Sequence, residues 1–247
     1  MVPVLSHDPE RNANPETAPR KLPEPYQDRP LEAISDDIRR ILSADGTLHG
    51  DEDDPDFIRR QIVSIKNAAL REGFLYDGLL PAFAGGAEHD VTFDPETGTV
   101  LKFTKPERAA YVVNFDLGTP KMASALPLEY MGRLMLQNDI FSDTLRFVGI
   151  GGEPGERRII TRQNIVVGRP ASWEEITSMM VEDLGFNKLR HNHGIGYDDS
   201  YAFVRDDAVV FDMRPANVFT TGEGVVIPVD CIPVKLPGGK RDFFDRS

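Results

Sequence analysis

The chain has 247 residues, a hydrophobic fraction of 40% and a formal net charge of −12 at pH 7. This length can bury a core as one large or two small domains, and the negative charge argues against a broad surface for nucleic acids or anionic membranes. The single cysteine, Cys231, excludes a disulfide within the chain and fits a reducing compartment. No apolar run approaches about 20 residues and residues 1–20 have no signal-peptide core, so we expect a cytoplasmic protein.

The N-terminal part is predicted to contain an arm followed by two helices. Residues 1–30 are rich in Pro, Asn, Glu and Arg and have no apolar period, which is typical of a flexible segment. Apolar residues then recur at helical spacing over Leu31–Leu42 and over Pro55–Glu72. Gly73 is placed to end the second helix, so residues 31–78 are predicted to be helical in character.

From Leu79 the pattern changes to strands. A turn over 94–98 separates a first strand from the alternating segment Thr99–Thr104. Before the first strand, Gly85 and Gly86 would let backbone amides approach a phosphate closely. Most glycine pairs beside a hairpin are structural, so this feature alone does not identify a site.

Lys102 lies in the second of these strands, between Leu101 and Phe103. A lysine in a buried strand needs an anionic partner, because a lone buried ammonium is costly. One candidate is Glu129, the only carboxylate before Asp139 in the helix predicted over 126–141. Two alternatives stay open. Lys102 lies on the solvent face of an edge strand, or Glu129 only interacts with the helix dipole of its own first turn.

Two strands and a helix are predicted next. The strands cover 144–150 and 157–167, and Gly168 to Ala171 break the second one. Ser172 to Glu175 read as a capping box that opens a helix ending at Leu184, with its methionines packed in the core. His191 and His193 follow in a polar loop. We interpret it as an exposed loop, because no further ligand lies nearby to complete a metal site.

The last chemically informative segment is Val209–Asp230. Its apolar run, Val209 to Phe211, predicts a strand that places Asp212 at its end, and Asn217 follows five residues later. A second strand starts at Val218, and a third over 225–229 leads to Asp230. Carboxylate and amide oxygens of this kind suit Mg²⁺, and a remaining carboxylate suits a base. The alternative is that these residues only serve turn chemistry.

The motifs and their order resemble the protein-kinase-like superfamily. Residues 212–217, DMRPAN, are similar to the catalytic loop D-x-[KR]-P-x-N, and Val229-Asp230 is similar to the metal-binding aspartate after the next hairpin. The segments GGAEHDVTFDPETGTVLKFTKP and PLEYMGRLMLQNDIF resemble more closely the kinase-like domain of polyvalent proteins from phages and conjugative elements. The resemblance covers roughly residues 79–236.

This resemblance implies roles for the C-terminal motif. Asp212 would be the catalytic base, and Arg214 would lie near the transferred phosphate. Asn217 and Asp230 would be the Mg²⁺ ligands. The implied cofactors are therefore ATP and Mg²⁺.

It also implies roles on the N-terminal side. The nucleotide-binding positions would be Gly85, Gly86, His89, Lys102 and Glu129. Lys102 would hold the α- and β-phosphates, oriented by Glu129, and residues 85–89 would cover the phosphates in place of G-x-G-x-x-G. The linker over 166–171 would contact adenine.

Three departures from the kinase pattern stand out. Val210-Phe211 replaces His-Arg before the base, and Cys231-Ile232 replaces Phe-Gly after the metal aspartate. Seventeen residues follow Asp230, which leads us to expect a truncated C-lobe without an activation segment. The resemblance therefore does not imply docking of a protein acceptor in the usual way.

The sequence thus predicts an α+β, protein-kinase-like fold with a β-rich N-lobe over 79–168 and a reduced C-lobe over 169–247. The predicted function is that of an ATP- and Mg²⁺-dependent phosphotransferase whose acceptor, a protein or a small molecule, is unknown. The alternative is a non-catalytic nucleotide-binding or interaction module, a pseudokinase, of a mobile genetic element. Transfer of AMP instead of phosphate is a third reading.

Overall fold

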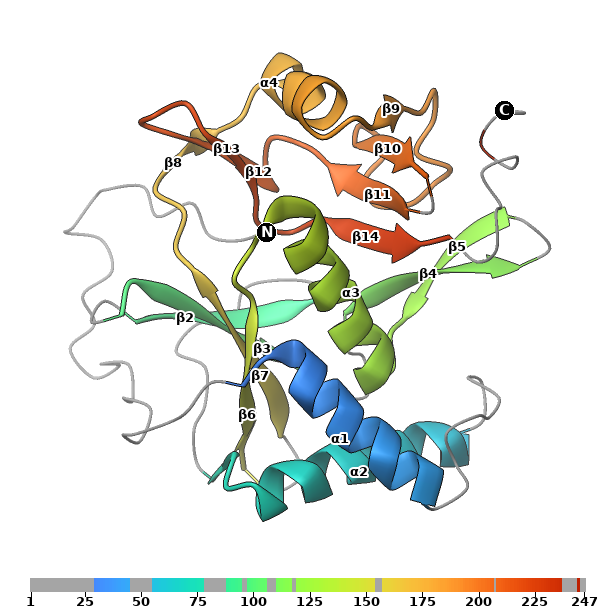
Figure 1. Ribbon diagram of the computed structural model, residues 1–247, viewed down its shortest axis with the longest axis vertical. Coiled ribbons are helices and arrows are strands. Elements are labelled where there is room, and N and C mark those ends of the chain that lie inside the picture. Colours follow the sequence, from blue (N-terminus) through green and yellow to red (C-terminus); the bar gives the residue numbers. More distant parts are fainter. Residues whose placement is uncertain are drawn as a thin grey trace. The chain divides into compact units, whose positions relative to one another are not determined.

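The computed structural model describes residues 29–44, 55–77, 88–94, 97–105, 110–116, 119–153, 157–206, 208–236 and 244. They form a mixed α+β structure, as the sequence predicts (Figure 1). The chain divides into two compact units. Unit 1 comprises Met1–Ala110, Ala125–Met131 and Thr144–Ile165, and unit 2 comprises Tyr111–Ser124, Gly132–Asp143 and Val166–Ser247. The partition into an arm, N-terminal helices and two kinase lobes stays a prediction.

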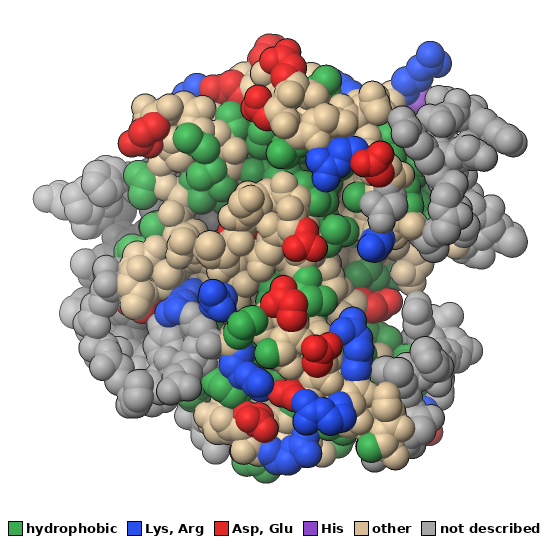
Figure 2. Space-filling view, viewed as in Figure 1, with side chains coloured by type: hydrophobic (Ala, Val, Ile, Leu, Met, Phe, Trp, Pro, Cys, Tyr) green, Lys and Arg blue, Asp and Glu red, His purple; other side chains and the backbone are tan. Residues whose placement is uncertain are grey.

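Unit 1 begins with two packed helices, α1 (Leu31–Ala44) and α2 (Pro55–Arg71). Both confirm the predicted helices. Gly73 ends α2 at φ +76°, and the Phe74 N–H donates to the Ala69 carbonyl at 2.7 Å, which closes the helix C-terminus. The outer faces of α1 and α2 carry acidic and basic side chains side by side (Figure 2), including ion pairs one turn apart such as Asp56–Arg59.

The helices lie against a five-stranded sheet with the order β1-β6-β7-β3-β2. Its strands are β1 (Leu75–Asp77), β2 (His89–Asp94), β3 (Thr99–Thr104), β6 (Arg146–Gly152) and β7 (Arg158–Asn164). Strand β1 runs parallel to β6, and the other pairs are antiparallel. The predicted strand Thr99–Thr104 is confirmed at both ends, and it lies inside the sheet between β7 and β2.

The two faces of this sheet differ in chemistry around β3. Leu101 and Phe103 point to one face, where they form an apolar cluster with Val148 and Ile160. Residues at alternate positions point to the other face, because strand side chains alternate with a period of two. Beside the apolar Val91 and Ile159, that opposite face carries polar side chains from three neighbouring strands, namely His89, Lys102, Thr104, Thr161 and Gln163. All five are buried.

The chain just before α1 is attached to this sheet through Arg29. Arg29 and Phe147 exchange two backbone hydrogen bonds of 2.9 and 3.1 Å. The Arg29 guanidinium pairs with buried Asp37 at 2.7 Å and lies over the Phe74 ring. Residues 1–28 lie outside the described residues, so the flexible arm stays a prediction, whereas Arg29 is bound to unit 1.

Unit 2 contains two further sheets and a two-stranded ribbon. The sheet orders are β14-β11-β10-β9 and β13-β12-β8, and β4 pairs with β5. The strands are β4 (Tyr111–Asp116), β5 (Thr119–Ser124), β8 (Gly168–Pro170), β9 (Asn187–Lys188), β10 (Tyr201–Arg205), β11 (Ala208–Met213), β12 (Val218–Thr221), β13 (Val226–Pro228) and β14 (Ile232–Lys235). Helix α3 (Pro127–Phe141) begins in unit 1 and continues into unit 2.

The predicted capping box is confirmed at α4 (Trp173–Ser178). The Ser172 side chain accepts the Glu175 N–H, and the Glu175 carboxylate accepts the Ser172 N–H. The predicted helix continues to Leu184, but its second half, Met179–Asp183, is a π-helix. Residues 168–170 do not merely break a strand, because they form β8 and pair with β12.

Several elements of unit 2 have no counterpart among the predicted ones. They are the ribbon β4–β5 and the strands β9, β10 and β14. In addition, β11, which contains Asp212, and β12, which begins directly after Asn217, belong to different sheets. No described helix is long and apolar enough to cross a membrane.

Candidate functional site

The centre of the candidate site in unit 2 is Asp212, near the end of β11. The residues before it, Val210 and Phe211, are fully buried and fix the strand. Asp212 itself has a left-handed backbone with φ +57°, a conformation that Asp tolerates better than most residues. Its side chain is half-buried.

Both carboxylate oxygens of Asp212 accept hydrogen bonds. Oδ1 accepts the backbone N–H of Tyr197 at 3.2 Å, and Oδ2 accepts Nδ2 of Asn217 at 2.8 Å. Burial raises the pKa of Asp212, and the negative charge of Asp230 acts in the same direction. The N–H of Tyr197, the Arg214 cation and the Asn217 amide oppose this rise. A carboxylate with a raised pKa is a better proton acceptor than an ordinary surface aspartate.

Asn217 links the loop after Asp212 to the segment that leads to Asp230. Its side-chain Nδ2 donates to the Asp212 carbonyl at 2.9 Å as well as to the carboxylate, and its backbone N–H closes a turn with the Arg214 carbonyl. Its carbonyl accepts the Val229 N–H at 2.8 Å. The residue is 2% exposed. Because both side-chain bonds use Nδ2, the oxygen Oδ1 is not engaged by them.

Asp230 follows the β12–β13 hairpin and is held from helix α3. Nη2 of buried Arg133 lies 3.6 Å from Asp230 Oδ1. The same guanidinium donates twice to the Cys231 carbonyl, at 3.2 and 2.9 Å, and once to the Tyr111 carbonyl at 2.9 Å. Arg133 therefore fixes the backbone immediately after Asp230.

Arg214 lies beside Asp212 in the same loop. Its Nε is 3.6 Å from Asp212 Oδ1, and its guanidinium lies 3.7 Å from the centre of the Tyr197 ring. The structure thus brings Asp212, Arg214, Asn217 and Asp230 together within unit 2, as the sequence motif predicts.

In unit 1, Lys102 is 5% exposed and lies opposite Val91 and Thr161 in the neighbouring strands. The alternative that this lysine lies on the solvent face of an edge strand is wrong, because β3 is an interior strand. A buried ammonium requires compensation by polar or anionic groups.

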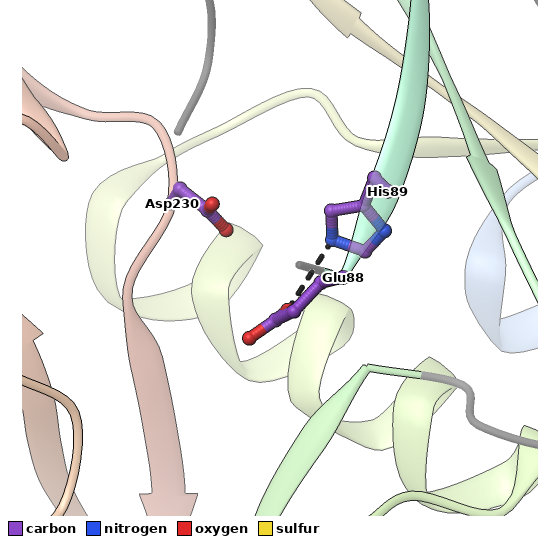
Figure 3. A group of neighbouring side chains, drawn as sticks. All are labelled: Glu88, His89 and Asp230. Carbon is purple, nitrogen blue, oxygen red and sulfur yellow. Dashed lines mark ion pairs between the residues drawn. The ribbon is translucent and has the colours of Figure 1, made fainter. Parts of the chain in front are cut away.

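His89 belongs to the same polar face of the sheet. Its Nδ1 lies 2.7 Å from Thr104 Oγ1, and the Thr104 hydroxyl also contacts the Tyr130 hydroxyl at 3.3 Å. Its Nε2 lies 3.4 Å from Glu88 Oε2 (Figure 3). These contacts fix the ring inside unit 1. Its role in covering nucleotide phosphates stays a prediction, and Gly85 and Gly86 lie outside the described residues.

Glu129 lies in the first turn of α3. Its Oε2 accepts the Leu126 N–H at 2.6 Å, so this carboxylate caps the helix N-terminus. This contact agrees with the alternative that Glu129 interacts with the first turn of its own helix, and the ion pair with Lys102 stays a prediction. One carboxylate can do both, since it has two oxygens.

The linker and the histidine loop have structural contacts of their own. Ala171 N–H donates to the Val218 carbonyl at 2.9 Å, which ties the linker to β12. Contact of this linker with adenine stays a prediction. His191 is exposed, as predicted, but His193 is half-buried and packs edge-on against Phe244. Burial, and then the charge of His191, lower the pKa of His193.

Sequence reasoning missed two groups that hold the site. Arg133 carries a weak signal, because it is an isolated cation in the otherwise apolar helix segment YMGRLML. Gly196 and Tyr197 carry a different one, a glycine-rich turn in front of a strand. Neither signal indicates a partner, because the contacts join residues far apart in the sequence.

Comparison with known proteins agrees with this geometry. A family model described as a serine/threonine/tyrosine kinase found in polyvalent proteins matches residues 80–236, more than half of the chain. No curated protein and no solved structure gives a significant match. The resemblance drawn from the sequence motifs is confirmed, and the chain belongs to the family of kinases found in polyvalent proteins.

Proposed function

We propose that this chain is an ATP- and Mg²⁺-dependent phosphotransferase with Asp212 as its catalytic base. The observation that carries the proposal is the cluster of Asp212, Asn217 and Asp230, in which the pKa of Asp212 is raised. Turn chemistry alone does not account for this arrangement, because Asp230 lies beyond a separate hairpin and its charge still acts on Asp212.

The donor set fits a magnesium ion. Mg²⁺ takes oxygen ligands, and the cluster offers the Asp230 carboxylate and the Asn217 side-chain oxygen Oδ1. The Asp230 side chain is 19% exposed and therefore open to solvent. Asn217 and Asp230 would hold the ion, which would neutralise charge on the nucleotide phosphates when bound.

Asp212 would act on the acceptor hydroxyl. Its carboxylate takes the hydroxyl proton while the acceptor oxygen forms a bond to the γ-phosphorus. The bond between that phosphorus and the β–γ bridging oxygen breaks, and ADP leaves with the electron pair. The Asn217 amide and the Tyr197 N–H hold the two carboxylate oxygens in place during this step. Arg214, beside Asp212, would stabilise charge on the transferred group.

Unit 1 would supply Lys102 for the α- and β-phosphates of ATP, with Glu129 orienting it. The support is that Lys102 is buried in an interior strand on a polar face, where an ammonium needs a compensating charge. The family membership supports the same role. Of the two roles suggested for Glu129, helix capping is already in place, and orientation of Lys102 would use its other oxygen.

The test is incubation with Mg²⁺ and ATP labelled either at the α- or at the γ-phosphate. We expect the γ label to move to protein, peptide or water in the wild type and not in Asp212→Ala. Movement of the α label would indicate AMP transfer instead. Strong Mg·ATP binding, seen as a thermal shift, without transfer of either label would identify a non-catalytic nucleotide-binding module.

A further inference from the structure

The base Asp212 is not held by the two residues that precede it. Val210 and Phe211 are fully buried and pack into the apolar cores of unit 2. They stand where ordinary protein kinases carry His-Arg, so no polar side chain is available there to orient the base. One contact to the Asp212 carboxylate comes from Asn217, and another comes from the loop over 192–200, about fifteen residues earlier in the chain.

This loop is fixed from within. Asn192 Nδ2 donates to the Tyr197 carbonyl at 2.6 Å and to Ser200 Oγ at 3.2 Å, and Asn192 Oδ1 accepts the Gly194 N–H. Ser200 Oγ donates in turn to the Tyr197 carbonyl at 2.7 Å. Ile195, which is 1% exposed, anchors the loop in the core of unit 2. A loop with these restraints presents its backbone at a defined position.

Two adjacent residues of the loop contact Asp212 directly. The Tyr197 N–H donates to Oδ1. Gly196, with φ +78°, lies so close that a Cβ atom there would come within 2.5 Å of Oδ1 and 2.8 Å of the Asp212 Cβ. Glycine is therefore required at position 196 both by the backbone angle and by the close approach.

The Tyr197 side chain makes the third contact, to Arg214. The guanidinium stacks on the ring at 3.7 Å, and the Arg214 Nε is a buried atom without a hydrogen-bond partner among the described residues. The stack and the nearby Asp212 carboxylate are thus what hold this cation. The tyrosine itself is 53% exposed. Its exposure indicates that the ring is not required for the core.

We infer that Tyr197 is a positioning residue for phosphoryl transfer. Its backbone N–H sets the position of Asp212, and its ring sets the position of Arg214. The inference rests on the function proposed above. The segment 192–200 thereby supports Asp212 on one carboxylate oxygen, while Asn217 supports the other.

The experiment compares Tyr197→Ala, Tyr197→Phe and Gly196→Ala with the wild type, and uses Asp198→Ala as a matched control in the same exposed loop. The readouts are kcat and KM for release of the γ-phosphate from ATP, and the thermal shift with Mg·ATP. We expect kcat to fall about tenfold in Tyr197→Ala and about a hundredfold in Gly196→Ala. KM for ATP and the thermal shift stay close to wild type, and Tyr197→Phe regains most of the lost kcat.

A second readout does not depend on activity. The Tyr197 amide should exchange slowly with solvent in the wild type and faster in Asp212→Ala, because its acceptor is gone. Equal exchange in the two proteins would overturn the inference. So would an active wild type with an equally active Tyr197→Ala, or a Tyr197→Ala variant that loses kcat and the Mg·ATP shift together. A wild type that transfers no phosphate at all would overturn the proposed function itself, and this role with it.

Discussion

The two units hold their candidate site residues in different ways. In unit 1, strand register fixes Lys102, since β3 has hydrogen-bonded neighbours on both sides and its side chain must point to the polar face. In unit 2, Asp212 is the penultimate residue of β11, has a left-handed backbone, and is held by single hydrogen bonds to its carboxylate from Tyr197 and Asn217. A residue held by register tolerates the loss of one neighbour better than a residue held by individual contacts. We therefore expect the loss of a single neighbour to displace Asp212 more than it displaces Lys102.

The largest expected effect separates the base from the metal ligands. Asp212→Ala should lower phosphate transfer by about a thousandfold or more while Mg·ATP still raises the melting temperature, because a base acts chiefly in the chemical step. Asp230→Ala should remove the Mg²⁺ dependence of that ATP-induced shift. A thermal-shift titration of the three proteins with ATP, with and without Mg²⁺, measures both. A wild type without any shift at millimolar ATP would contradict the nucleotide-binding function.

The corresponding change in unit 1 is Lys102→Met. Methionine keeps the length but leaves the groups that compensate the buried ammonium without their cation, so we expect the melting temperature without ligand to fall. The ATP-induced shift should be lost, because the ammonium for the phosphates is gone. Lys105→Met, at an exposed position just after the same strand, is the matched control. If Lys102→Met binds ATP like the wild type, the role of Lys102 in nucleotide binding is wrong.

The sequence predicts features that depend on neighbouring residues better than contacts between residues far apart in the chain. The strand Thr99–Thr104 is predicted to the residue and the end of α2 to within one residue, because alternation and a C-terminal glycine are local signals. The ribbon β4–β5 is missed, although Tyr111, Val113 and Phe115 recur at every second position of its first strand. The structure brings Asp212, Arg214, Asn217 and Asp230 together in unit 2, and their catalytic and metal-binding roles stay predictions. Their supports are missed, because the contact of Arg133 with Cys231 spans 98 positions.

Arg133 provides the third test, on stability. Arg133→Met leaves the Cys231 and Tyr111 carbonyls without their donor, and Asp230 without its cation. We expect a loss of about 2–4 kcal/mol in the free energy of unfolding, since buried groups deprived of a partner bear their full desolvation cost. Arg133→Lys keeps the charge but not the forked geometry and should recover only part of the loss. Urea unfolding of the three proteins measures it, and a loss below about 0.5 kcal/mol would show that these contacts matter little.

A smaller effect is expected at the start of the described chain. A variant lacking residues 1–28 should unfold like the full-length protein, because the composition of that segment predicts no packed structure. A variant lacking residues 1–30 also loses two backbone hydrogen bonds to Phe147 and the ion pair with Asp37. We expect it to be less stable by about 1–2 kcal/mol. A large loss already in the shorter deletion would mean that residues 1–28 pack against the fold.

The smallest effect concerns the capping box of α4 and its pH dependence. The pKa of Glu175 is lowered to about 2, first by the hydrogen bond from Arg169 and then by the Ser172 N–H. A group with a lowered pKa in the folded state stabilises the protein above its unfolded pKa, about 4.5 for a glutamate, and this contribution is lost as the pH falls toward 2. Glu175→Gln keeps the capping geometry and removes the charge.

The stability difference between wild type and this variant should therefore be level from pH 7 to about pH 5 and shrink below that. It should also weaken in high salt, because the pair is exposed. Chemical unfolding at each pH measures it, with Glu174→Gln as the control that removes the same charge from the same turn. A difference that stays constant down to pH 2 would show that the ion pair contributes nothing and that the cap alone acts.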